Sequence, residues 1–538
     1  MKRQARPWPL VHVRSASRFA LRLNRLAAYG LDRLVWSRLL PARRGRPQAA
    51  LSPALLATKA IRHRPPGLSV SAPSGRFAAW TDGFAAVHAA LFLNLQKGGS
   101  PAGPRYAHPS PAFRAIYLWD SAFIAQIWKW WDPEVAFDVL RAVVERRDGD
   151  RLQHFAADFG GSKLTQPPLI AWSLERLGSA ADPDRRAAWS RELYEPLRAY
   201  HGWLAANRRL ACGLYAWAHP YESGVENAPR FSSRDERRLD DTRGLAAPDF
   251  SSYMVLKCEA LAAMARRLGR AEEAAAFDRE AQALRQAINA RLWDDEEGLY
   301  FDRDVATGAF VRSRTIASLL PLWAGVPDQA RAARLHAHIL SPASFNTVIP
   351  LPSVALADRD FEKDMWRGPV WVNLAYAVIE GLRRYGFHET AADLAFRLCD
   401  GVYRTFRNTG HFHEFYDPER HDVDELRRKR GNRWKRLTLG SRPLSGFVGW
   451  SGLVNTLAID VLFGLCRTEA GMVLQPRFPP SAAGARFSLQ LRGEDLVLSV
   501  DVKAGDACEV GLRSPRGERR FLAGFGEVLR LDAEGRRP

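Results

Sequence analysis

The chain has 538 residues, of which 46% are hydrophobic, so it can bury a large core in roughly two to four domains or in one large barrel. Its five cysteines form no CxxC motif and no close pair, which argues against a disulfide framework and a zinc site and favours reduced thiols. The formal net charge is +19, and residues 1–46 alone hold twelve Lys or Arg against one acid, Asp32.

The N-terminal region, residues 1–66, is predicted to be a basic amphipathic helix from about Ser15 to Leu40 followed by a linker rich in Pro, Arg and Gly. Arg18 and Arg22 fall on one helical face, while Leu23 and Leu26 fall on another. Such a helix either docks on the body of the protein or lies on an anionic membrane surface. Because arginines interrupt every apolar stretch, neither a secretory signal nor a membrane span is predicted. We expect a cytoplasmic protein, with peripheral contact at the inner face of the membrane as the alternative.

A second concentration of basic residues lies at 427–436. Nucleic acid is one partner that such a patch can take. No recognition motif accompanies it, so nucleic-acid binding is not expected.

Apolar residues recur with a helical period from Ala78 to about Leu465, and loops with aromatic and polar residues separate the helices. The helices come in pairs without a strict sequence repeat, which favours a closed toroid of helical hairpins over a solenoid. The body of the protein is therefore assigned to residues 67–470. Helices are predicted near 80–96, 119–129, 133–147, 167–178, 187–208, 251–268, 271–291, 313–324, 327–340, 370–385, 388–407 and 446–465.

The pattern changes to a period of two after Gly471. Alternating apolar residues predict strands over 486–491 and 496–502, with turns at Gly493 and Gly505. A small antiparallel β domain is therefore predicted over residues 471–538.

Two acidic loops point to chemistry. The stretch Tyr221–Phe231 has two carboxylates, Glu222 and Glu226, with a Gly and a Pro that suit a loop better than a helix interior. Far away in sequence, the stretch His411–Pro418 places Glu414 among aromatic residues. Acids on solvated loops are common, but two of them on separate loops suggest an acid/base pair.

Three further loops have residues suited to sugar binding. Asp120 opens a helix, where it is either an ordinary first-turn acid or an acceptor for sugar hydroxyls. Gln166 precedes two prolines, so it is either part of a helix start or a contact to a polar ligand. The stretch Asp364–Trp371 places two Trp beside Arg367, which offers apolar faces for a sugar ring and donors for its hydroxyls.

Several ordered motifs together resemble inverting glycoside hydrolases of families 63 and 37, which include processing α-glucosidases, trehalases and mannosylglycerate hydrolases. The resemblance covers roughly residues 110–465. Its motifs, in chain order, are Trp119-Asp120-Ser121, Thr165-Gln166-Pro167-Pro168, the run from Glu222 to Phe231, Asp249-Phe250-Ser251-Ser252-Tyr253, the run from Trp293 to Tyr300, the run from Trp366 to Trp371, and the run from Gly446 to Trp450.

The resemblance implies an all-α (α/α)6 barrel with its site in a funnel at one end. It assigns the general acid to Glu226 and the general base to Glu414, with no metal and no cofactor. The implied substrate is a glucoside, a mannoside or a related small saccharide or glycoside with an α-glycosidic bond. The implied substrate-binding residues are Trp119, Asp120, Gln166, Glu222, Asn227, Arg230, Trp366, Arg367, Gly368, Trp371, Tyr416 and Trp450.

The acid position departs from the family pattern, because Glu226 stands where the family has an Asp. The added methylene moves the carboxyl by about 1.5 Å, on a scale at which about 1 Å matters for proton delivery. Glu222 is the reserve candidate for the acid. Three other readings stay open: a carbohydrate-binding protein on a hydrolase-like barrel, an isomerase using His411 and His413, and an interaction protein of helical-repeat type.

Overall fold

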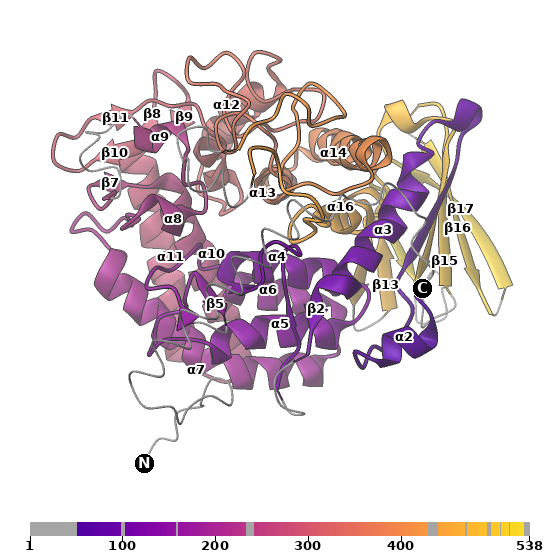
Figure 1. Ribbon diagram of the computed structural model, residues 1–538, viewed down its shortest axis with the longest axis horizontal. Coiled ribbons are helices and arrows are strands. Elements are labelled where there is room, and N and C mark those ends of the chain that lie inside the picture. Colours follow the sequence, from indigo (N-terminus) through magenta and orange to yellow (C-terminus); the bar gives the residue numbers. More distant parts are fainter. Residues whose placement is uncertain are drawn as a thin grey trace.

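Long helices form the body of the molecule, and an antiparallel sheet stands at one side of it (Figure 1). The computed structural model describes residues 51–97, 103–157, 160–232, 241–428, 440–468, 471–491, 496–505, 507–515 and 517–531. The predicted N-terminal amphipathic helix lies outside the described residues, as do positions 429–436 of the second basic patch. Within the described part of the chain, no helix combines the length and the apolar character needed to cross a bilayer.

A set of central helices makes a closed cycle of contacts. Helix α4 (Leu118–Trp128) contacts α6 (Ile170–Leu177), which contacts α10 (Pro248–Arg267). Helix α10 contacts the 3-10 helix η5 (Ile316–Leu322), which contacts α13 (Val372–Arg384). Helix α13 contacts α16 (Leu453–Leu457), and α16 returns to α4. Every residue of α4 is buried, as expected for a helix with other elements packed on all of its sides.

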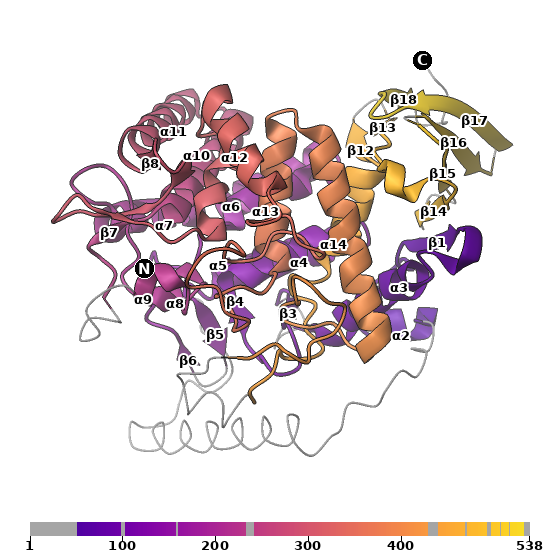
Figure 2. The same ribbon diagram turned by 90° about the horizontal axis from the view of Figure 1, so that it is seen from above.

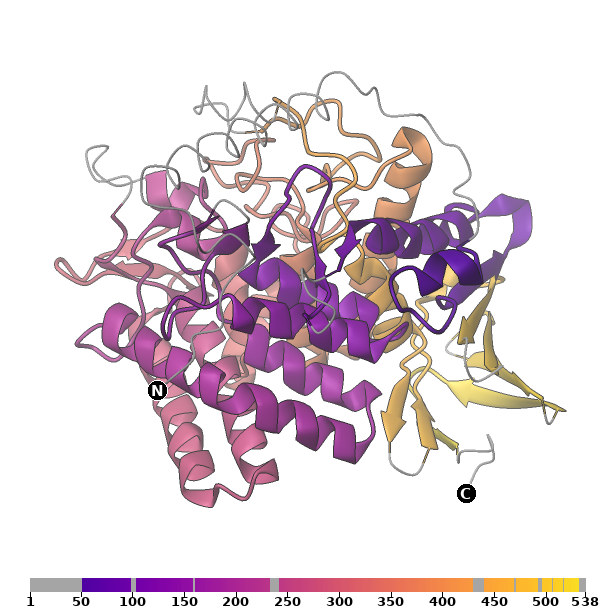
Figure 3. The same ribbon diagram turned by 60° about the horizontal axis from the view of Figure 1, so that its bottom comes forward.

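A second set of helices packs outside this cycle. Helix α5 (Pro133–Glu145) lies on α4, α11 (Ala271–Arg291) lies on α10, and α14 (His388–Thr409) lies on α13. Helix α3 (Ala79–Asn94) contacts α14, and α7 (Pro183–Arg208) contacts α5 and α10. Seen with the bottom of the molecule forward, the purple helices from the first half of the chain lie side by side, and the sheet stays at one edge (Figure 3).

Local chemistry explains several helix starts. The Asp132 carboxylate accepts the backbone N–H of Glu134 at 3.1 Å and caps α5, whose first residue is Pro133. Asp182 caps α7 in the same way through the N–H of Arg185 at 2.8 Å. The remaining helices are α2 (Pro53–Ala57), η2 (Pro73–Gly75), η3 (Gly178–Ala180), α8 (Pro220–Ser223), α9 (Pro229–Ser232), α12 (Gln329–Leu340), η6 (Ala458–Leu462) and η7 (Pro480–Ala482).

The predicted helices agree with the structure to within a few residues, with two exceptions. The segment predicted near 313–324 is a 3-10 helix, η5, with Pro321 inside it, and Pro lacks the N–H that an α-helical ladder needs. The segment predicted near 446–465 is helical only from Leu453, and it continues as the π-helix η6. The expectation of a mainly helical chain with an antiparallel sheet near its C-terminus is confirmed.

The main sheet has five strands in the order β1-β14-β15-β16-β17, all antiparallel. Its strands β14 (Arg486–Leu491) and β15 (Leu496–Val502) coincide with the two predicted ones. Strand β1 (Gly67–Ser71), which the sequence assigned to the barrel, is an edge strand of this sheet and pairs Leu68 with Leu489 (Figure 2). The other two strands are β16 (Ala507–Ser514) and β17 (Gly517–Gly524).

The sheet packs on the helical body through aromatic residues. Phe487 on β14 lies 5.4 Å from the ring of Trp80 on α3 and 6.1 Å from the ring of Phe396 on α14. Short strands complete the structure, and most of them lie in the loops between the helices. They are β2 (Leu95–Gln96), β3 (Tyr106–Ala107), β4 (Ile116–Tyr117), β5 (Phe155–Ala157), β6 (Gly160–Gly161), β7 (Leu245–Ala246), β8 (Trp293–Asp294), β9 (Leu299–Tyr300), β10 (Asp302–Asp304), β11 (Phe310–Val311), β12 (Cys466–Thr468), β13 (Gly471–Leu474) and β18 (Leu529–Leu531).

Candidate active site

A cavity of about 350 Å³ lies where several of the central helices begin. Trp119 and Asp120 stand in the first turn of α4, Trp371 is the residue before α13, and Trp450 lies just before α16. Helix N-termini carry partial positive charge and free N–H groups, so this end of the helical body suits polar or anionic groups. The predicted residues that line the cavity are Trp119, Asp120, Gln166, Glu226, Trp366, Trp371, Glu414 and Trp450.

Glu226 lies on the turn between α8 and α9. The chain reverses at Gly224, whose φ is +74°, a left-handed conformation that favours glycine. A Cβ at Gly224 would stand 2.5 Å from the Trp119 ring, so only glycine lets the backbone approach the cavity wall this closely. The turn thereby brings Glu226 to the cavity.

Glu414 enters the same cavity from the loop after α14. It is 3% exposed, and its backbone N–H donates to the carbonyl of Leu444 at 3.0 Å. The indole N–H of Trp450 donates to the Glu414 carbonyl at 2.8 Å. The two predicted catalytic carboxylates therefore line one cavity although 188 positions separate them in sequence (226 to 414).

Asp120 connects the two carboxylates electrostatically. Burial raises its pKa to about 8, a hydrogen bond to its own backbone N–H opposes the rise, and the negative charges of Glu414 and Glu226 add to it. Charges act on a pKa in this way only over short distances in a cavity. Asp120 is thus a neutral carboxyl near pH 7, able to donate a hydrogen bond as well as to accept one.

Arg428 also lines the cavity, and the sequence analysis did not select it. Its Nε donates to Glu414 Oε2 at 2.9 Å, and its Nη2 donates to Glu414 Oε1 at 3.2 Å. Burial lowers the pKa of Arg428, but the charge of Glu414 and then those of Glu226 and Asp364 outweigh this, so the pKa is raised. Among the described residues that line the cavity, Arg428 is the single Lys or Arg.

Tryptophans form the walls. The rings of Trp366 and Trp371 are stacked with their centroids 3.5 Å apart, and Trp119 packs against Trp366 and Trp450 at 6.2 and 5.7 Å. Gln166 holds the start of α4, because its Oε1 accepts the backbone N–H of Trp119 at 3.3 Å. Such apolar faces with a few fixed polar groups suit a sugar ring.

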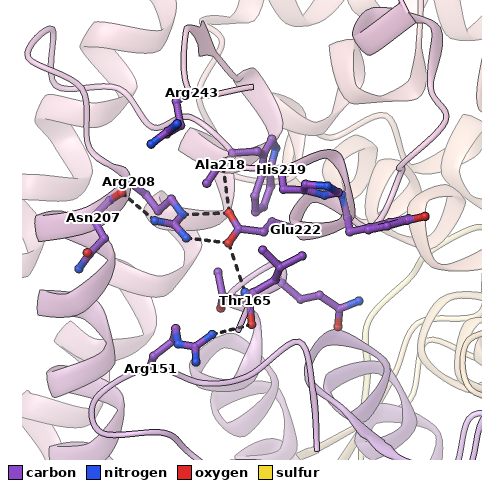
Figure 4. A network of polar contacts seen from close by, with 12 residues as sticks. Arg151, Thr165, Asn207, Arg208, Ala218, His219, Glu222 and Arg243 are labelled. Carbon is purple, nitrogen blue, oxygen red and sulfur yellow. Dashed lines mark hydrogen bonds and ion pairs between the residues drawn. The ribbon is translucent and has the colours of Figure 1, made fainter. Parts of the chain in front are cut away.

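Glu222 does not line the cavity in the described structure. Its carboxylate is fully buried and accepts Arg208 Nη2 at 2.7 Å and Nε at 2.9 Å (Figure 4). It also accepts the backbone N–H groups of Ala218 at 2.9 Å and Thr165 at 3.3 Å (Figure 4). Glu222 thus ties the loop of Glu226 to the loop of Gln166. The sequence instead led us to expect that Glu222 contacts the substrate, with a reserve role as the general acid.

Other predicted binding residues also lie behind the cavity wall. Arg230 is fully buried and pairs with Asp249 and, at 3.2 Å, with Asp302. Arg367 donates to Glu362 at 3.0 Å. The guanidinium groups of Arg230 and Arg367, which were expected to donate to sugar hydroxyls, therefore bind carboxylates of the protein instead.

The last three predicted binding residues have backbone-supporting contacts. The N–H of Gly368 donates to Ser353 Oγ at 2.9 Å, and Tyr416 pairs through its backbone with Val370. The side-chain amide of Asn227 binds the backbone of Asp364 and Trp366. Direct contact of these residues with substrate is not supported by their position, while the roles of the cavity-lining residues stay predictions.

Sequence reasoning did not name several lining residues as binding residues. Most of them are aromatic, and Tyr221, Met365 and Phe447 lie inside stretches that the sequence had already singled out, which was the available signal for these three. The unnamed residues include Phe113, Tyr117, His154, Phe155, Tyr221, Met365, Arg428 and Phe447.

One group of potential metal ligands lies outside the cavity. His201, Cys258 and Glu280 have ligand atoms within 4.8 Å of one another, on α7, α10 and α11. His201 Nε2 and Glu280 Oε2 already form a hydrogen bond at 3.0 Å. This group therefore has a packing role that needs no ion.

A helical body, a cavity with paired carboxylates and tryptophan walls together define a glycoside hydrolase. The chain belongs to the family of the mannosylglycerate hydrolase MGH1-like glycoside hydrolase domain, whose profile matches residues 115–435. It is 31% identical over 373 residues to a mannosylglycerate hydrolase of Thermus thermophilus, covering 56% of this chain and 88% of that protein. It is 30% identical over 313 residues to that of Rubrobacter radiotolerans, covering 48% and 69%.

Solved structures agree with this assignment. The family 63 mannosylglycerate hydrolase from Thermus thermophilus in complex with glucose aligns with a TM-score of 0.58 at 26% identity, covering 69% of this chain and 98% of that one. The same enzyme in complex with Tris and D-glycerate aligns with a TM-score of 0.57 at 25% identity, with the same coverage.

Proposed function

We propose that this glycoside hydrolase cleaves an α-glycosidic bond of a small glycoside with inversion, using Glu226 as general acid and Glu414 as general base. The observation that carries the proposal is that both carboxylates line one cavity and that the charges of both raise the pKa of Asp120. The cycle of contacts from α4 through α16 and back supports the (α/α)6 toroid that the family resemblance implies.

In the proposed reaction, protonated Glu226 donates to the glycosidic oxygen as the bond to the anomeric carbon breaks. Ionised Glu414 takes a proton from a water that attacks the anomeric carbon from the opposite face. The water needs a gap of about 6.5–9.5 Å between the two carboxyl groups. The products are a sugar of inverted configuration and the free alcohol of the aglycone, and both carboxyl groups then exchange protons with solvent.

The remaining cavity residues fit the sugar. The Trp366–Trp371 stack offers an apolar wall to a ring face, and Asp120 and Gln166 offer polar groups to hydroxyls. The relatives' names point to mannosylglycerate, and the related structures with glucose and with D-glycerate point to a sugar and a small hydroxy acid. We therefore include 2-O-glycosyl glycerates in the proposed substrate class, beside glucosides, mannosides and trehalose.

A substrate panel with two variants tests the proposal. Glu226→Gln should remove most turnover of natural glycosides while keeping sugar binding, and activated aryl glycosides should lose less because their leaving groups need little protonation. Glu414→Gln should reduce turnover of every substrate. A wild-type protein inactive on the whole panel, or a fully active Glu226→Gln variant, would contradict the assignment.

The main alternative is a carbohydrate-binding protein on this barrel. Two observations favour it: Glu226 is one methylene longer than the acid of the family, and Glu414 is bound by Arg428. Sugar binding measured by calorimetry without product release would support this alternative. An isomerase is less well supported, because His411 and His413 are absent from the described cavity lining and burial lowers the pKa of His413 to about 3.

A further inference from the structure

Arg428 makes an unusual contact for a residue beside a general base. It is 3% exposed, and its guanidinium meets the Glu414 carboxylate as a two-pronged donor, Nε to Oε2 and Nη2 to Oε1. A two-pronged contact of this kind fixes the plane of a carboxylate as well as its charge. Each carboxylate oxygen keeps a second lone pair, so the contact leaves room for a water on Glu414.

The backbone around Arg428 is held by a neighbouring loop. The N–H of Arg427 donates to the carbonyl of Lys363 at 2.8 Å, and the N–H of Met365 donates to the carbonyl of Arg427 at 3.2 Å. Asp364 and Arg427 accordingly form a parallel bridge. The N–H of Arg428 itself donates to the carbonyl of Ser441 at 2.9 Å. The position of the guanidinium therefore depends on residues 363–365, through Arg427, and on Ser441.

The same loop is attached to the general acid's turn. Asn227, the residue after Glu226, donates from Nδ2 to the carbonyl of Asp364 at 3.2 Å. Its Oδ1 accepts the N–H of Trp366 at 3.0 Å. Hydrogen bonds thus run from the turn of Glu226 through residues 363–366 to Arg427 and Arg428, and end on the Glu414 carboxylate.

We propose that Arg428 is the positioning residue of the general base, and that Asn227 and Arg428 together set the separation between the acid and the base. The inference rests on the proposed function, since it assigns these two residues to the same reaction. An inverting enzyme needs a fixed gap between its carboxyl groups, and a continuous hydrogen-bonded path between two separate loops provides one. Neither residue transfers a proton; Asn227 acts through the loop and Arg428 through the Glu414 carboxylate.

The first experiment compares Arg428→Gln and Arg428→Lys with the matched control Arg427→Gln, whose side chain donates to nearby backbone carbonyls. Arg428→Gln should lower kcat by roughly 100-fold or more on natural and activated substrates alike, with little change in KM, because the base serves every substrate. Arg428→Lys should recover part of the lost kcat, because it keeps the cation beside Glu414. Arg427→Gln keeps the backbone bonds at position 427 and should match wild type. A folded Arg428→Gln protein with wild-type kcat, or one that loses activity through KM alone, would overturn the role.

The second experiment tests the path between the two loops. Asn227→Ala and Arg428→Gln are combined, and kcat is measured for both single variants and the double variant. If Asn227 and Arg428 act through one path, the loss of log kcat in the double variant should be clearly smaller than the sum of the losses in the two single variants. Full additivity would contradict the proposed path, and the pair Asn227→Ala with Arg427→Gln gives the additive reference.

A third measurement separates this inference from the proposed function. Arg428→Gln leaves the buried Glu414 carboxylate without its cation, so its Tm should fall relative to wild type. Adding Glu414→Gln to Arg428→Gln removes the unpaired charge and should restore much of the lost Tm. No such recovery would overturn the ion pair even in an active enzyme. If Tm recovers in the double variant but the wild-type protein turns over no substrate, the proposed function and the catalytic role are both contradicted. The Arg428–Glu414 pair is then a contact that only stabilises the fold.

Discussion

At the scale of single residues, Asp120 links stability to pH. Its pKa is raised from the ordinary value of a carboxyl to about 8, first by burial and then by the charges of Glu414 and Glu226. In the unfolded chain Asp120 ionises near pH 4, while in the folded protein it stays protonated until about pH 8. The unfolded state therefore binds fewer protons between these values, and stability falls as pH rises through this window.

The variant Asp120→Asn should remove this pH dependence. We expect its Tm, relative to wild type, to rise between about pH 4 and pH 8, while its activity falls because the amide alters contacts with the sugar. Thermal unfolding across this range is the measurement. A wild-type minus variant difference in Tm that stays constant with pH would show that Asp120 titrates normally.

Gly224 is the second residue whose chemistry is specific. Gly224→Ala places a Cβ 2.5 Å from Trp119 in a backbone with φ of +74°, so the cavity wall must move. We expect a loss of about 1–3 kcal/mol of stability together with reduced turnover. The control is Gly269→Ala, which has the same φ but no atom within 4 Å of its Cβ. Gly269→Ala should lose only the stability that the unfavourable backbone conformation costs, and it should keep full activity. Equal losses of activity in the two variants would contradict a clash between the new Cβ at position 224 and Trp119.

The sequence predicted the site residues unevenly, and the reason is physical. Glu226, Glu414 and Asp120 lie in short motifs whose residue types already suit acid/base chemistry and sugar binding. Arg428 lies in a basic run that resembles a solvated surface, and only its contact with Glu414 distinguishes it. Arg230 and Glu222 carry suitable groups, but Asp249 and Asp302 bind Arg230, and Arg208 at the end of α7 binds Glu222. Such pairings depend on tertiary contacts that local patterns do not encode.

At the scale of elements, a buried ion-pair cluster lies at the ends of the central helices opposite the cavity. Lys129 follows α4, Arg176 ends α6, and Glu380 lies in the second half of α13. Lys129 and Arg176 approach Asp460 of η6, and Arg176 donates to Glu380 at 3.0 Å. Cations at the C-terminal ends of helices also complement the helix dipoles. The cluster thus joins three helices of the central cycle, α4, α6 and α13, to the π-helix η6 that continues α16.

Asp460→Asn tests the cluster. It leaves the Lys129 ammonium buried without its carboxylate, so we expect a loss of roughly 3 kcal/mol of unfolding free energy. The control is Asp241→Asn, which breaks the exposed pair with Arg243 and should change stability far less. Chemical denaturation measures both. Equal effects would contradict a special role for the buried cluster.

Helix positions were predictable because the helical period of apolar residues is a local property. The caps and prolines at the starts of α5 and α7 are visible in the sequence. The 3-10 form of η5 was not predicted although Pro321, which disfavours an α-helix, is visible in the sequence. The π-helix η6 was not predicted either, since the packing of the central cycle decides its form. In the sheet, alternation identified β14 and β15, but it could not identify a partner for β1 that follows more than 400 positions later.

At the scale of the whole molecule, strand β1 joins the start of the described chain to the C-terminal sheet. Leu68 is 5% exposed and faces the core of the sheet next to Leu489, while Ser69 on the other face is exposed. Leu68→Ala should cost about 2–4 kcal/mol of stability, and the control Ser69→Ala should change it by about 0.5 kcal/mol or less. The loss should appear in one unfolding transition if the sheet and the helical body unfold together. A separate early transition for the variant would show that the sheet unfolds on its own.

The stereochemistry of the reaction tests the central claim most directly. An α-glycoside that the enzyme turns over is hydrolysed in an NMR tube, and the anomeric proton of the first sugar released is observed before mutarotation. Acid/base catalysis by Glu226 and Glu414 with a water between them predicts the β-anomer first. The α-anomer first would mean that one carboxylate attacks the sugar directly, and it would contradict the account.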